Sequence, residues 1–152
     1  MVLPVQVHPD ETLARFIATA GRINKETLRP RVELFMPHPY FELSVFRTTE
    51  ISHQACRDLG QREFADKLSI PTALVGWTDL KARHIFERKL TLDTSSPPND
   101  PSHERPANVM GWPAFPGDRK MEKALHKEIA LELVAAASTV RFASAGANEA
   151  AK

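Results

Sequence analysis

The sequence predicts an α+β domain, in which a mixed sheet of about four to six strands is covered by about three or four helices, mainly on one face. Short runs rich in β-branched and aromatic residues, at 32–36 and 40–47, are typical of strands. A long apolar stripe at helical spacing over 118–137 predicts a helix that packs on the sheet as its main cover. The 152 residues, 42% hydrophobic and 26% charged, suffice for one ordinary globular core.

The first element expected is an amphipathic helix over residues 10–20. Asp10 is a suitable cap for its start, and Gly21 is suitable for its end. The segment 22–31 is polar and basic, and Pro30 prevents it from continuing as a helix, so we expect a loop or a short turn there. The apolar residues at helical spacing are Leu13, Phe16, Ile17 and Ala20.

Two strands are expected next, at 32–36 and 40–47, on either side of a Pro-His-Pro sequence. They would form an antiparallel hairpin or two neighbouring strands of the sheet. A second helix follows them, and Gly60 either ends or interrupts it. The residues that show its helical spacing are Ile51, Ala55, Cys56 and Leu59.

Two later segments, 73–92 and 107–142, share the order strand, Gly-Trp, helix, strand. We expect the first helix to begin near Thr78 or Asp79 and the second to be capped by Asp118. The likeness fits either an internal duplication or two unrelated segments that have similar sequences because they form similar structures. The closing strands are indicated by Leu90 with Leu92 and by Val140 with Phe142.

The chain is expected to form one domain over residues 1–142, followed by a polar tail at 143–152. The segment 93–106 holds four of the twelve prolines and almost no apolar residue. Such a composition cannot build a core, so we expect a surface loop.

The bulk composition bounds location and partners. The net charge of +1 gives no support for strong nonspecific attraction to nucleic acid or to an anionic membrane. The single cysteine, Cys56, cannot form an internal disulfide, which favours a reducing compartment. No signal-like leader and no run of about 20 apolar residues is present, so we expect a cytoplasmic protein that does not cross a membrane.

Arg47 is an unusual residue for its position. Counting by twos along the expected strand, Phe41, Leu43 and Val45 share one side of the chain, and Arg47 is next on that side. A guanidinium on a packed face needs a carboxylate, carbonyl groups or a bound anion such as a phosphate. Arg47 is therefore either an anion binder or a structural residue at the strand end, which extends to water or pairs with an acidic side chain.

Known catalytic and cofactor patterns are missing. No phosphate-binding glycine loop occurs, and no histidine pair has the spacing of a zinc site, so we expect no cofactor and no metal. His53 lies one helical turn from Cys56, but a thiol on the apolar side of a helix is usually a core residue. The six histidines are His8, His38, His53, His84, His103 and His126.

Aromatic and apolar residues near the C-terminal half provide candidates for an interface. The aromatic Gly-Trp turn at 108–118 fits either the lining of a pocket or interface or a plug for the end of the sheet. The wide apolar surface at the end of the last helix is either buried between other elements or in contact with another chain. Clusters of lysine and arginine near residues 22–31 and 119–123 fit solvated faces, because acidic residues are interspersed among them. The candidate binding residues are Trp77, Trp112, Phe115, Leu131 and Val134.

The motif LSVFRT at 43–48, followed by ANVMGWP at 107–113 and a terminal amphipathic helix, resembles a group of small uncharacterised bacterial proteins. The likeness covers most of the chain and implies no established activity. That group often carries a histidine just before its Ala-Asn, whereas Pro106 stands here and His103 lies three residues earlier. The resemblance therefore does not transfer a histidine role to this chain.

Two functions remain as expectations, and the sequence leaves open whether the protein is an enzyme. The first is a cytoplasmic accessory or partner-binding protein that works in an assembly with itself or with another chain. The alternative is an enzyme acting on a phosphate-bearing substrate, a nucleotide or a nucleic acid, with Arg47 holding the phosphate. One of His38, His84 or His103 would then be the acid or base.

Overall fold

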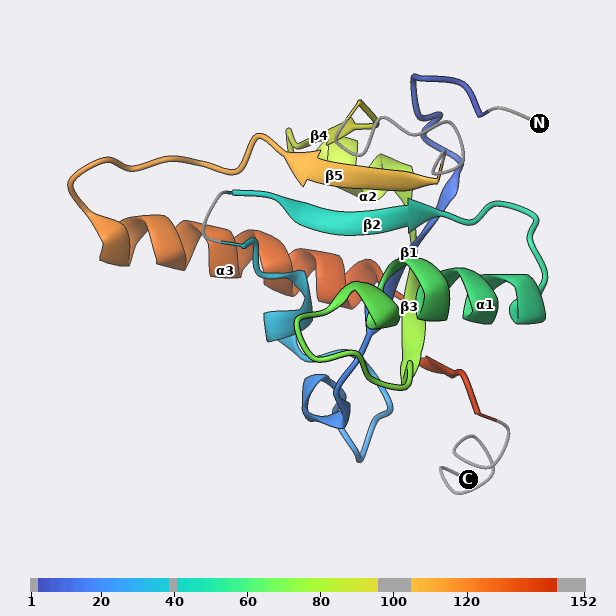
Figure 1. Cartoon of the computed structure of the whole chain (residues 1–152). Coiled ribbons are helices and arrows are strands. Elements are labelled where there is room, and N and C mark those ends of the chain that lie inside the picture. The colour runs from blue at the N-terminus through green and yellow to red at the C-terminus, as the bar shows by residue number, and fades with distance from the viewer. Residues whose placement is uncertain (1–2, 39–40, 96–104, 145–152) are drawn as a thin grey trace.

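The computed structural model describes residues 3–38, 41–95 and 105–144. They form an α+β fold with a six-stranded sheet in the order β4-β5-β2-β1-β3-β6, which confirms the predicted class (Figure 1). Every neighbouring pair is antiparallel, although a mixed sheet was expected. The strands are β1 (Thr12–Ile17), β2 (Leu43–Arg47), β3 (Gly76–Lys81), β4 (Thr91–Asp93), β5 (Pro106–Met110) and β6 (Arg141–Phe142).

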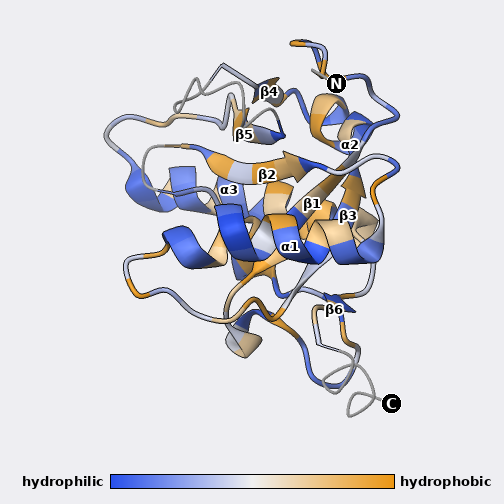
Figure 2. Ribbon diagram, turned by 45° about the vertical axis from the view of Figure 1, so that its right-hand side comes forward, coloured by the Kyte–Doolittle hydropathy of each residue, from blue (hydrophilic) through white to orange (hydrophobic). Residues whose placement is uncertain are grey.

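Helices cover both faces of this sheet rather than mainly one. Figures 1 and 2 show α1 on one side of the strands, and α2 and α3 on the other. The long helix α3 is the C-terminal cover that the sequence predicts, and no helix of the described residues is long and apolar enough to cross a bilayer. The helices are α1 (His53–Glu63), α2 (Ala82–Glu87) and α3 (Arg119–Ala136), with 3-10 turns η1 (Ala20–Arg22), η2 (Val32–Phe35) and η3 (Ala65–Lys67).

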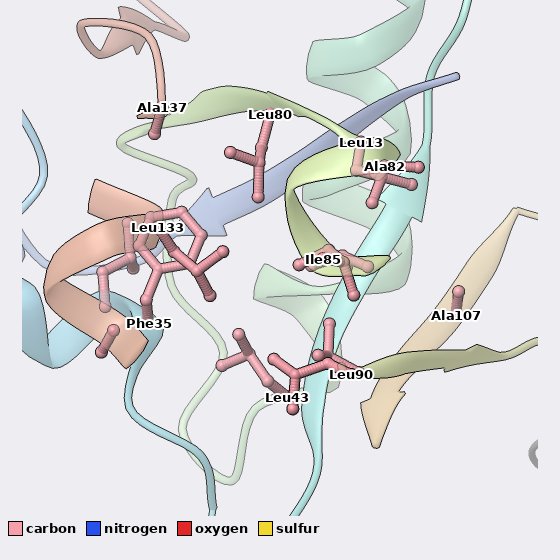
Figure 3. Close-up of a cluster of buried hydrophobic side chains, with 14 of the residues drawn as sticks. Leu13, Phe35, Leu43, Leu80, Ala82, Ile85, Leu90, Ala107, Leu133 and Ala137 are labelled. Carbon is pink, nitrogen blue, oxygen red and sulfur yellow. The ribbon is translucent and has the colours of Figure 1, made fainter. Parts of the chain in front are cut away.

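Two hydrophobic cores lie against the two faces. The larger one packs strand residues against α2, α3 and η2, and Figure 3 shows part of it, including Leu13, Leu80 and Leu133. The smaller one packs Phe16, Phe46 and the neighbouring strand residues against α1. The inner strands therefore bury both of their faces.

This double burial explains why the helix predicted at 10–20 is wrong. Those residues contain β1, in which Leu13 and Ile17 enter the larger core while Ala14 and Phe16 enter the smaller one. A strand buried on both faces places apolar residues at spacings of three and four, as an amphipathic helix does. The periodicity alone could not separate the two.

The strand predicted at 32–36 is also wrong, because residues 32–35 form the 3-10 turn η2. Leu34 and Phe35 are consecutive and both enter the larger core, which a turn allows and an extended strand does not. The second predicted strand exists as β2, but it pairs with β1 and β5, so the expected hairpin does not form.

The two Gly-Trp segments differ in structure, which removes the support for a duplication. Gly76 begins β3, where an added Cβ would lie 2.3 Å from the Arg141 carbonyl oxygen, so the close approach of β6 requires glycine. Gly111 follows β5 and has a φ of +86°, which glycine adopts without strain. The helix expected at Thr78 or Asp79 begins only at Ala82.

Other predicted elements are confirmed. Helix α1 lies where helical spacing was found, and Gly60 is inside it. The Asp118 side chain accepts a hydrogen bond from the Met121 amide and caps α3 as expected. At the other end of α3, Arg29 donates hydrogen bonds to three backbone carbonyl groups, those of Val134, Ala135 and Ala137.

The segment between β4 and β5 and the polar tail lie largely outside the described residues, and so does His103. Among the described strands, β1 and β2 share only two paired positions, Leu13 with Arg47 and Ala14 with Phe46. By contrast, β1 pairs with β3 along its whole length. Figure 1 shows β2 and β5 crossing the direction of β1 and β3, so the sheet opens beyond this short junction.

Candidate functional site

Arg47 belongs to a buried ion pair. Its side chain is 2% exposed, and its Nε and Nη2 donate to the two carboxylate oxygens of Glu11 at 2.8 and 2.9 Å. Its Nη1 donates to the carbonyl oxygen of Pro4, near the start of the chain. This arrangement matches the structural-pair alternative and leaves Arg47 closed to a phosphate.

The carboxylate of Glu11, which pairs with Arg47, has a pKa suited to a buried ion pair. Burial raises the pKa of Glu11, but the hydrogen bond from Arg47, the His8 amide and the nearby positive charges outweigh it, so the pKa is lowered overall. Glu11 is therefore ionised at neutral pH and balances the buried guanidinium.

Of the histidines proposed as acid or base, the two that the structure describes lie in other parts of the fold than Arg47. His38 is exposed at the edge of a separate groove. His84 is on α2, with Nδ1 3.8 Å from the Glu87 carboxylate. His103 lies outside the described residues.

Cys56 is placed as a core residue. It lines a small hollow of about 230 Å³ together with His53, Trp77 and Asp79. Burial raises the pKa of its thiol to about 12, with a further contribution from the Asp79 charge, so the sulfur is protonated at neutral pH. The His53 ring packs against Trp77, with ring centroids 4.8 Å apart. The arrangement does not produce an activated nucleophile.

Both tryptophans are packed inside the chain, which favours the plug interpretation over an interface. Trp77 is 2% exposed in the smaller core, and Trp112 is 4% exposed in the larger core. The Trp112 indole N–H donates to the Val109 carbonyl oxygen at 3.1 Å. Val134 is partly buried against the larger core. Only Phe115 and Leu131 of the expected interface set are exposed, at 46% and 51%.

A groove away from Arg47 contains an arginine without a carboxylate partner among the described residues. It has a volume of about 820 Å³ and opens where β1 and β2 diverge, beside η2 and the end of α1. Its lining includes Arg15 and the apolar residues Phe16, Leu34, Phe64 and Leu68. We call it the Arg15 groove.

Arg15 has no carboxylate partner among the described residues. Its Nε donates to the Leu34 carbonyl oxygen at 2.9 Å, and its Nη1 donates to the Ser44 carbonyl oxygen at 3.1 Å. Within the described ranges Nη2 has no hydrogen-bond partner, and the guanidinium carbon lies 5.7 Å from the Phe64 ring centroid. Burial lowers the pKa of Arg15 to about 10, and the charge of Arg22 contributes, so the surroundings disfavour this cation.

The rim adds two more cations, Arg22 and Lys123, and two carboxylates, Glu33 and Glu42. None of these four side chains forms an ion pair with another described residue. Counting Arg15, three cations against two carboxylates leave one net positive charge on the groove.

A second hollow, of about 880 Å³, continues from this groove along the N-terminal part of α3. The two hollows share four lining residues, three of them in the segment 36–38, so they lie next to each other there. Arg119 and Lys120 line the second hollow. The shared residues are Met36, Pro37, His38 and Lys123.

The expected site residues did not include Arg15, although a signal for it existed. Once β1 is read as a strand, Leu13, Arg15 and Ile17 share one side of the chain, the pattern that identified Arg47. Reading the segment as a helix concealed this. Among the described residues, no cluster of three or more histidine, cysteine or acidic side chains could hold a metal.

Comparison with known proteins gives no relative: no family model, no curated protein and no solved structure matches this chain.

Proposed function

We propose that this chain is a cytoplasmic accessory protein that binds a protein partner, and that a segment of the partner lies in the Arg15 groove. The observation that carries this is the Arg15 guanidinium, which meets backbone carbonyl groups and no carboxylate among the described residues. A partly buried cation without a counter-charge is costly, so a bound anion would be stabilised there.

The chemistry of the groove favours a chain segment that combines acidic and apolar side chains. The walls offer apolar surface from Phe64 and Leu68, whereas Phe16 and Leu34 of the lining are buried, and the rim offers Arg22 and Lys123. The volume of about 820 Å³ is comparable with that of established ligand sites. Such a mixture is typical of peptide-binding grooves, in which apolar contacts give affinity and charges select the partner.

The alternative, an enzyme acting on a phosphate-bearing substrate, would now depend on Arg15 and His38, since Glu11 occupies Arg47. The two rim carboxylates, Glu33 and Glu42, weigh against it, because they would repel a phosphate dianion or a polyphosphate. A single carboxylate matches the net charge of the groove better.

The proposal is tested by affinity purification from the native host. The bait would be wild-type protein, a groove variant with Arg22→Glu and Lys123→Glu, or a control with Lys25→Glu and Lys127→Glu. The control residues are exposed lysines outside both hollows, so both variants reverse two surface charges. A partner recovered in stoichiometric amount by wild type and control, and lost by the groove variant, is expected.

The recovered partner would then be purified and recombined with each variant, and the mass of the complex measured by light scattering. A stoichiometric partner that the groove variant retains would contradict the proposed docking site. A chain that remains a monomer and recovers no stoichiometric partner would contradict partner binding altogether.

A further inference from the structure

We infer that the Arg15 groove selects its ligand through one carboxylate, which accepts a hydrogen bond from Nη2 of Arg15 while an attached apolar group packs on Phe64 and Leu68. This inference rests on the proposed function and names the chemical group that the partner presents. The carboxylate belongs to an acidic side chain of the partner segment.

Arg15 is held in a fixed orientation, so it can favour one kind of anionic group over another instead of attracting all anions equally. Two of its nitrogen atoms are fixed by the carbonyl groups of Leu34 and Ser44, from η2 and β2, so the guanidinium is held in one orientation. A donor that is already ordered loses little entropy when a ligand binds. The carbonyls that hold it are neutral, so they leave its positive charge unbalanced.

The divergence of β1 and β2 explains how a strand residue reaches this place. If the register of β1 and β2 continued beyond Ala14 and Phe46, Phe16 would lie opposite Ser44, but the two strands stop pairing before that point. The Ser44 carbonyl accepts from Arg15 instead. The side chain thus links β1 to β2 where the two strands diverge, and it forms part of the groove lining.

Charge and shape together point to a monoanion with an apolar body. One net positive charge on the groove is balanced by one carboxylate, whereas a phosphate dianion would exceed it beside Glu33 and Glu42. The Phe64 ring forms the wall of the groove next to the Arg15 guanidinium. Leu68 also lines the groove and is 36% exposed. Covering these groups adds hydrophobic stabilisation to the charge contact.

The test uses three small probes of similar size: 3-phenylpropionate, its neutral amide 3-phenylpropanamide, and phenyl phosphate. Each is titrated to about 20 mM into full-length protein labelled with ¹⁵N, a range suited to the weak binding of such fragments. The spectra follow the backbone amides and the Nε–H signals of the arginine side chains, at constant pH and ionic strength.

We expect 3-phenylpropionate to shift the Arg15 Nε–H signal and the amides of Ser44 and Phe64, with a dissociation constant of about 1–10 mM. The neutral amide should bind at least about fivefold more weakly, because a hydrogen bond to a charged group is lost. Phenyl phosphate should also bind more weakly than the carboxylate. Arg15→Lys should reduce this selectivity, and Lys123→Met should weaken all anionic probes without removing the preference.

Since Arg15 also holds the sheet, Arg15→Lys is interpreted only if its amide spectrum remains that of a folded protein. Whether or not this variant folds, the shift of the Arg15 Nε–H signal in wild-type protein tests the inference. Equal binding of the acid and the amide, tighter binding of phenyl phosphate, or no shift of Arg15 would overturn the inference.

These failures are distinct from failure of the proposed function. If the groove variant loses its partner while the acid and amide bind equally, the groove docks the partner without carboxylate selection. If the acid binds selectively while the groove variant keeps its partner, the anion site exists but the partner binds elsewhere.

Discussion

Replacing Glu11 by glutamine tests the buried ion pair most directly. The change keeps the shape of the side chain but leaves the Arg47 guanidinium, 2% exposed, without its counter-charge. Removing one partner of a buried pair costs about 3–5 kcal/mol. The Glu11 side chain is 16% exposed, so water reaches one side of the pair and we expect the lower end, about 3 kcal/mol. For a chain of 152 residues this lowers the melting temperature by about 6–12 °C.

The pH dependence follows from the lowered pKa of Glu11. Its ordinary value is 4.5, so the stabilisation is fully present above that pH and is lost as the pH falls through the lower value of the folded state. Wild-type protein should therefore lose this contribution on acidification. The Glu11→Gln variant has no such group, so its stability should fall less over the same interval.

The assay is urea unfolding of wild type, Glu11→Gln, Arg47→Met and the double variant. The double variant should lose at least about 1 kcal/mol less than the sum of the two single losses, because it buries no unpaired charge. Glu26→Gln is the control, since Glu26 is exposed and has no ion pair among the described residues. Additive losses, or a Glu11→Gln loss no larger than that of the control, would refute the reasoning.

Three further predictions concern packing, capping and reactivity. Gly60→Ala should destabilise the fold by about 1–3 kcal/mol in urea unfolding despite its better helix propensity, because the new Cβ would lie 2.5 Å from the buried Phe16 ring; a gain in stability would show that the ring can move. Arg29→Met should cost about 2 kcal/mol and increase amide exchange at the end of α3, because three carbonyl groups lose the hydrogen bonds from Arg29 and, among the described residues, only that of Val134 keeps another donor, the Ala137 amide. Unchanged exchange would contradict this. Cys56, whose pKa is raised to about 12 by burial, should react with iodoacetamide at pH 8 at least about a hundredfold more slowly in native than in urea-unfolded protein, and equal rates would contradict its burial.

The sequence predicted the elements whose signals are local. Helix α3 was found from its stripe and its Asp118 cap, and α1 from its apolar spacing. The α+β class follows from these helices and from strand-like runs such as β2. Each signal depends on residues within one element, so no tertiary contact was needed to interpret it.

Elements whose environment depends on the rest of the chain were misread. Strand β1 lies in the middle of the sheet and is buried on both faces, so its apolar spacing imitates a helix. The turn η2 has strand-like composition but packs two consecutive side chains into one core. The identity of the neighbouring layers, which sequence periodicity does not contain, decides both cases.

The candidate site shows the same division. Counting by twos identified Arg47 as an arginine that must be paired, but Glu11 lies 36 residues away, so the choice between carboxylate and external anion could not be made. Arg15 fits the same rule once its strand is known. The groove itself follows from the short pairing of β1 with β2, a tertiary feature without a local sequence signal.

The most direct test of the central claim is calorimetric titration of the purified partner into wild type, the Arg22→Glu/Lys123→Glu groove variant and the Lys25→Glu/Lys127→Glu control. If the partner lies in the Arg15 groove, the groove variant should bind at least about tenfold more weakly, about 1.4 kcal/mol, while the control matches wild type. Equal affinity of the groove variant and wild type would contradict the account.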